Sequence, residues 1–239
     1  MASPRMKRFY ETAATAKTDG GYHITLDGKP IRSPGGETVL VRNKALAEAM
    51  AAEWENQLPH VEFSSMGINQ LVNSAIDRGA DDRIKLADAL LAYGATDLLC
   101  YRADGPAALA ARQVEAWDPL LDWAEARYGV RLRVTSGIVA IEQDSAVLAA
   151  LQARIAAADP FQLCALRAAV GICGSLIVGL AVAEGHLDID SAWQVVNVDE
   201  DWQREKWGED AQAAANRAGA FTAFTQAGHM LQVLESDTN

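Results

Sequence analysis

Signals for β-structure are confined to the first forty residues of this 239-residue chain. An apolar run at the start of Tyr22 to Ser33 leads into Asp27-Gly28, a pair that tolerates positive φ and favours a hairpin turn. Pro30 suits an edge strand, and Pro34-Gly35-Gly36 predicts a second turn before a short strand over Glu37 to Val41. This distribution predicts an α+β fold, in which a small β-containing N-terminal domain is followed by a larger all-α helical domain.

Helical periodicity begins at Asn43, a candidate N-cap, after which Leu46, Met50 and Trp54 recur every four residues until Pro59 approaches. The stripe predicts that Trp54 is a core residue. Apolar spacing and capping signals predict further helices over Met66 to Ile76, Asp81 to Tyr93, Pro106 to Gly129, Ser145 to Ala157, Phe161 to Glu184, Ser191 to Trp207 and Ala211 to Leu234.

The predicted domains are residues 1–75, an α+β unit with the hairpin, and residues 76–239, an all-helical unit. Val130 to Val134 and Gly137 to Ile141 fit either two short strands or an extended loop.

Composition restricts the partners of this protein. The net charge of -11 argues against nucleic acid and anionic membrane surfaces, because both would repel the chain. The longest apolar stretch, Ala168 to Ala183, is short for a membrane helix and favours a buried core helix, so no integral membrane association is expected. Three cysteines without metal or redox spacing predict reduced, mostly buried thiols in a cytosolic compartment.

Sequence signatures of catalysis are absent from the chain. It contains no GxGxxG, GxxxxGK[ST], HExxH or GxSxG motif, and its four histidines lack metal-ligand spacing. The absence of these motifs argues against nucleotide-dependent catalysis, and we expect no cofactor, no metal and no small-molecule substrate.

The helix predicted over Ser191 to Trp207 would carry two apolar stripes on nearly opposite faces. One stripe consists of Trp193, Val196, Glu200, Gln203 and Trp207; the other consists of Val195, Val198 and Trp202. Such a helix must bury both faces, either inside the protein or with one face against a partner.

Glu200 is the unusual member of the first stripe, because a carboxylate between tryptophans needs a partner if it is buried. Three interpretations are open. The side chain is an internal ion-pair member, with an arginine such as Arg167; it is a recognition group for another protein; or it joins Asp199, Asp201 and Asp210 in a metal site. Helical geometry spreads these acids around the axis, which weakens the metal interpretation.

Seven segments in the same order resemble the Atp12 family, the assembly chaperones of the F1 sector of ATP synthase. They are KRFY, LDGKPIRSP, EWENQ, TDLLCYRA, WDPLLDWAEARYG, GSLIVGLA and DEDWQREKWGED. The resemblance implies a non-enzymatic chaperone that binds the unassembled F1 α subunit and shields the surface that α later gives to the β subunit. It also implies a small α+β domain followed by a helical one. The short N-terminus resembles the bacterial, cytoplasmic form, and a processed organellar form would lie in the mitochondrial matrix.

Carried over by position, the family's partner-binding pattern falls on Glu200, Gln203, Trp207 and Gly208, with Asp199, Glu209 and Asp210 beside it. The N-terminal EWxxQ pattern falls on Glu53, Trp54 and Gln57, which we expect to be a structural motif. The alternative function is a metal- or carboxylate-dependent hydrolase that uses the acidic cluster from Asp199 to Asp210.

Overall fold

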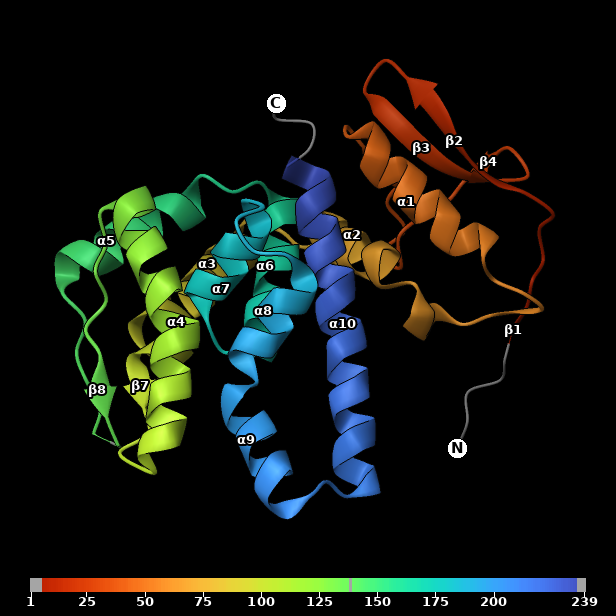
Figure 1. Cartoon of the computed structure of the whole chain (residues 1–239). Coiled ribbons are helices and arrows are strands. Elements are labelled where there is room, and N and C mark those ends of the chain that lie inside the picture. The colour runs from red at the N-terminus through yellow and green to blue at the C-terminus, as the bar shows by residue number, and fades with distance from the viewer. Residues whose placement is uncertain (1–5, 138, 236–239) are drawn as a thin grey trace.

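A four-stranded antiparallel sheet forms the N-terminal part of the computed structural model, which describes residues 6–137 and 139–235 (Figure 1). The central strand β3 pairs with each of the other three strands. The strands are β2 (Ala13–Thr18), β3 (Gly21–Leu26), β4 (Lys29–Pro30) and β5 (Leu40–Val41). Helix α1 (Lys44–Glu55) packs against β2 and β3, with Leu46, Met50 and Trp54 buried.

The predicted hairpin is confirmed between β3 and β4. Asp27 and Gly28 have φ values of 49° and 78°, and Thr25 pairs with Pro30 across the turn. Asp27 also accepts backbone hydrogen bonds from Glu11 and Thr12, which fixes the strand entry before β2.

The remaining helices are α2 (Gly67–Asp77), α3 (Ala80–Ala95), α4 (Ala107–Tyr128), α5 (Ser145–Ala156), α6 (Pro160–Cys173), α7 (Leu176–Ala183), α8 (Ile189–Val196), α9 (Val198–Trp207) and α10 (Ala211–Glu235). Shorter elements connect them: β1 (Met6–Lys7), β6 (His60–Val61), η1 (Phe63–Ser65), η2 (Leu98–Cys100), β7 (Tyr101–Arg102) and β8 (Thr135–Ser136). The α+β fold class is confirmed.

Two predicted helices are each broken into two. The segment Phe161 to Glu184 divides because Gly174 adopts a left-handed conformation at the end of α6, and the Ser175 side chain then caps α7 by accepting from Val178. The segment Ser191 to Trp207 divides at Asn197, which ends α8 and precedes α9. Both single-helix predictions are therefore wrong.

The segment after α4 is an extended loop, which was one of the two alternatives. Among its described residues, which leave out Ile138, only Thr135 and Ser136 are in a strand, β8. They pair in parallel with β7. The described residues of Val130 to Val134 and of Gly137 to Ile141 form no strand, since the residues that pair with β7 lie between these two segments.

Helix α10 lies between the sheet with α1 and the other helices (Figure 1). It contacts α1, α2, α6, α7 and α8, and all eight residues of α7 are buried beside it. All three cysteines are free and buried, as predicted. Among the described residues, no helix is long and apolar enough to cross a membrane.

Asp97 is a fully buried carboxyl group that joins two parts of the helical region. Its oxygens accept from the backbone N–H of Leu99 and from that of Ile177 in α7, each at 3.1 Å. Burial raises the pKa of Asp97 from 3.8 to about 6, against the opposing effect of hydrogen bonds from Ser175 and the backbone. The folded protein therefore holds this proton at a pH where the unfolded chain releases it.

We expect the contribution of Asp97 to stability to fall as pH rises from about 4 to 6. The raised pKa of Asp97 stabilises the folded state fully below the unfolded pKa, and this contribution of about 3 kcal/mol is lost as pH rises through the folded pKa. Denaturant titrations across this range should show the native sequence losing stability relative to Asp97→Asn, which cannot titrate. Parallel pH profiles for the two proteins would contradict the assignment.

Candidate functional site

Helix α9 and the loop that joins it to α10 form one end of the molecule, at the bottom of Figure 1. The break at Asn197 separates α9 from α8, so the stripe predicted from Trp193 to Trp207 does not exist as one surface. Trp193 packs on Phe221 and Phe224 of α10, whereas Trp207 lies at the far end of α9. The prediction of one continuous stripe is therefore wrong, and its residues on α8 and α9 make separate contacts.

The two tryptophans of α9 have opposite environments. Trp202 is 8% exposed, and the Arg112 guanidinium of α4 lies 4.9 Å from its ring centre, with the Lys206 ammonium at 4.8 Å. Trp207 is 78% exposed, more than any other large hydrophobic residue in the described part of the chain. A surface tryptophan of this kind is typical of a binding anchor.

Glu200 forms an ion pair with Arg217 of α10 at 2.9 Å, and its side chain is 48% exposed. Arg217 is 14% exposed and also binds Asp201 at 2.7 Å. The partner proposed from the sequence, Arg167, lies instead over the ring of Tyr93. The internal ion pair thus exists with a different arginine, and half of the Glu200 carboxylate side chain remains available to solvent.

Further charges line a polar groove of about 590 Å³ between α9 and α10. Arg204 pairs with Asp201 at 3.0 Å and with Glu209 at 3.4 Å, and Glu205 pairs with Arg112 at 2.8 Å. The Arg112 guanidinium lowers the pKa of Glu205, so this carboxylate stays ionised. The ion pairs fix the ends of α9 relative to α4 and α10.

Two other acids that the sequence analysis named accept hydrogen bonds from groups within the protein. Asp199 accepts a hydrogen bond from the buried Gln113 at 2.6 Å, and Asp210 caps α10 by accepting from Ala213 at 2.8 Å. Gly208 ends α9 with φ 81° and ψ -174°, a conformation that favours glycine. Gln203 is exposed.

These placements give no support to the alternative of a carboxylate-dependent hydrolase. The acids from Asp199 to Asp210 are engaged by arginines, an amide or a backbone N–H of α4, α9 and α10. Two arginines are shared: Arg217 binds Glu200 and Asp201, and Arg204 binds Asp201 and Glu209. Within the described residues, no group of three His, Cys, Asp or Glu side chains is arranged to hold a metal ion.

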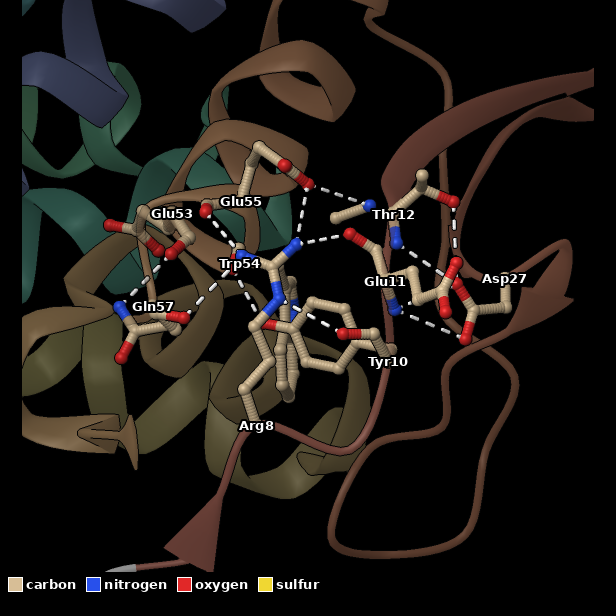
Figure 2. Close-up of polar contacts among 10 residues, drawn as sticks. Arg8, Tyr10, Glu11, Thr12, Asp27, Glu53, Trp54, Glu55 and Gln57 are labelled. Atoms are coloured by element: carbon tan, nitrogen blue, oxygen red, sulfur yellow. Dashed lines mark hydrogen bonds and ion pairs between the residues drawn. The ribbon is translucent and has the colours of Figure 1, made fainter. Parts of the chain in front are cut away.

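The EWxxQ residues, whose side chains are drawn in Figure 2, connect α1 to α2 and η1. The Glu53 carboxylate accepts from the backbone N–H groups of Ile68 and Asn69, each at 2.9 Å, at the start of α2. The Trp54 indole donates to Asn69 at 3.0 Å, and Gln57 accepts from the backbone N–H of Glu62 at 2.7 Å.

Arg8 attaches the N-terminal segment to the same end of α1 (Figure 2). Its guanidinium donates to the backbone oxygens of Glu55 and Glu11, each at 2.6 Å, and pairs with the Glu55 carboxylate at 3.1 Å. The EWxxQ motif and Arg8 therefore hold the sheet, α1 and α2 together.

Sequence reasoning did not identify Arg112, Gln113 or Arg217 as parts of the candidate site. A signal was present for Arg217, which is the only lysine or arginine between Ala211 and Glu235. Arg112 and Gln113 lie some ninety residues from their partners on α9, so no local pattern marks them.

Comparisons with known proteins bear on the whole chain. The family model described as "ATP12 chaperone protein" matches residues 7–125. A mitochondrial atp12 protein of Schizosaccharomyces pombe is 29% identical over 231 residues, which are 90% of this chain and 79% of the relative. The crystal structure of Atp12 from Paracoccus denitrificans is 38% identical with a TM-score of 0.89, over 95% of this chain and 98% of that one.

A protein of Agrobacterium tumefaciens described as a candidate chaperone gives a TM-score of 0.91 at 38% identity, over 95% of this chain and 86% of that chain. Fold and relatives together define a molecular chaperone, a class that implies a binding protein and not an enzyme. The chain belongs to the Atp12 family, and this assignment supports a role in the assembly of the F1-ATPase.

Proposed function

We propose that this protein binds the free F1 α subunit through α9 and the start of α10, and shields the β-facing surface of α until β replaces it. The observation that carries the proposal is Trp207, 78% exposed at the end of a helix whose charged neighbours are held in ion pairs. We expect it to act in the bacterial cytoplasm or, in an organellar form, in the mitochondrial matrix, and its bacterial and mitochondrial relatives support this expectation.

The arrangement around Trp207 suits capture of an unassembled subunit. An interface anchor is most effective when a large aromatic group is surrounded by polar groups at the rim. Here Glu200 and Arg204, which lie on the same face of α9 as Trp207, supply that rim, and their ion pairs orient them before binding. The chain carries no nucleotide-binding motif, so displacement by β, rather than nucleotide hydrolysis, is the expected release step.

The test of this proposal is co-purification of the tagged protein with isolated F1 α and, separately, with F1 β, followed by addition of the missing subunit. Capture of α alone, reversed by β, is the expected result. Capture of β, or of neither subunit, would contradict the proposal.

Glu200→Lys is expected to weaken capture of α by roughly tenfold or more while leaving the protein folded. The substitution reverses a half-exposed charge at the site, and Arg217 keeps its contact with Asp201. Since exposed ion pairs contribute at most about 1 kcal/mol, the melting temperature should change little. Capture is measured by pull-down, and folding by circular dichroism.

Glu125→Lys is the matched control. Glu125 lies on α4, away from α9; its side chain is 53% exposed and pairs with Arg131. It should capture α as the native protein does. If Glu200→Lys unfolds the protein, Glu200 is a structural ion-pair member and its recognition role fails.

A further inference from the structure

We propose that two hollows on either side of Pro160 bind an extended segment of a partner protein in which large apolar side chains alternate with carboxylates. This inference goes beyond capture of the α subunit, and it concerns the opposite end of α10 from Trp207. Helix α10 has 25 residues, so the two regions are separated by a helix of about 37 Å.

The first hollow lies where α2 ends and where α3 and α6 begin. Its volume is about 210 Å³, and its apolar wall is formed by Ala75, Leu86, Leu163 and Cys164. Pockets for small ligands are usually larger, roughly 300 to 1,000 Å³. This hollow is therefore of a size for one apolar side chain rather than for a cofactor.

Two guanidinium groups, those of Arg78 and Arg83, stand at the same hollow. Arg78 donates to the Ser74 hydroxyl at 3.0 Å, and Arg83 donates to the backbone oxygen of Ala158 at 2.9 Å. Neither arginine forms an ion pair with a carboxylate whose side chain is described. In a chain of net charge -11, two arginines beside an apolar hollow that have no ion pair with a described carboxylate favour a ligand that carries carboxylates.

The second hollow shares Pro160 with the first and lies between α1, the start of α6 and the end of α10. Its volume is about 580 Å³, with Leu46, Phe161 and Leu234 among its apolar residues. Arg42 lines it as well, again without an ion pair to a described carboxylate. Asp159, the acid in this hollow, is engaged in capping α6 through the backbone N–H groups of Phe161 and Gln162.

An extended segment is the occupant that fits this pair of hollows. Side chains of a strand alternate between two faces, so residues two apart point the same way, about 6.6 Å along the strand. Two apolar side chains of one segment can thus enter the hollows on the two sides of Pro160. The intervening acidic side chains lie on the solvent face of the segment, and the long, exposed side chains of Arg42, Arg78 and Arg83 at the rims extend past the segment to pair with them.

The test uses the full-length protein and a defined probe, an acetylated and amidated peptide of three Leu-Asp repeats. Cys164 is the reporter, because it lines the first hollow whereas Cys100 and Cys173 line neither. The rate at which methyl methanethiosulfonate modifies each cysteine is followed by mass spectrometry. The peptide is expected to slow modification of Cys164 several-fold and to leave the other two rates unchanged.

Charge recognition is tested with Arg78→Gln/Arg83→Gln and with a peptide of three Leu-Lys repeats. The double variant should bind the acidic peptide at least about tenfold more weakly. Arg78→Gln alone, which keeps the Arg83 contact with Ala158, should show part of that loss and covers the case in which the double variant misfolds. Lys85→Gln, two residues after Arg83 on α3 and outside the hollow, is the matched control and should bind normally.

Three outcomes would overturn the proposal: no protection of Cys164 at about millimolar peptide, equal protection by the lysine peptide, or unchanged binding to the double variant. F1 α is absent from this experiment, so a negative result would not count against the proposed capture of α. A negative result in the capture experiment would likewise not count against this peptide site.

Discussion

Trp54→Ala is expected to lower the free energy of unfolding by about 3–5 kcal/mol. Trp54 is 8% exposed in the core between α1 and the sheet, and its indole donates to Asn69 of α2. Its ring also makes edge contacts with Tyr10 and Phe63, at centroid distances of 5.7 and 6.1 Å. Removing it leaves a cavity and an unpaired amide oxygen in the same place.

Denaturant unfolding is the measurement for Trp54→Ala, with a lower midpoint expected. Trp207→Ala is a matched control, since the same substitution at a 78% exposed position should change stability by less than about 0.5 kcal/mol. A Trp54→Ala protein with the native melting temperature would contradict the place of Trp54 in the core.

Trp207→Ala is expected instead to weaken capture of F1 α by about 2 kcal/mol, or roughly 30-fold. Burying this indole against the partner is the main apolar gain that the α9 surface can offer, because Trp202 is already buried. Titration of labelled α with each chaperone variant measures the change in dissociation constant.

Ile84→Ala is the control for this loss, because Ile84 is also exposed, at 62%, on another helix. It should leave the dissociation constant for α unchanged. Native affinity in Trp207→Ala would place the α-binding surface elsewhere on the chaperone.

Local sequence signals predicted much of the fold, and their failures have physical causes. The hairpin and α1 follow from Asp27-Gly28 and from the four-residue spacing before Trp54. Strand β2 was missed because Ala13–Thr18 has no alternation of large apolar residues; it forms by pairing along its whole length with β3. The breaks at Gly174 and Asn197 interrupt otherwise continuous apolar patterns, and tertiary contacts decide whether such residues end a helix.

The location of the candidate site remains a prediction, and its geometry was not predictable from the sequence. Family resemblance places the partner-binding pattern on Glu200 and Trp207, and the exposure of Trp207 is compatible with a binding surface. The pairing of Glu200 with Arg217 depends on how α10 packs beside α9. The periodicity of residues within α9 contains no information about that packing. The division into residues 1–75 and 76–239 remains a prediction.

The position of α10 also determines when this protein can finish folding. Phe224, Met230 and Leu231 are buried residues of α10, and the helix contacts α1, α2 and α6, which are synthesised much earlier. A nascent chain that has not yet added α10 lacks these side chains, so its earlier helices keep apolar surface exposed until α10 has been synthesised. A premature stop codon within α10 is thus expected to remove the whole chaperone through degradation, and not to leave a shortened, working one.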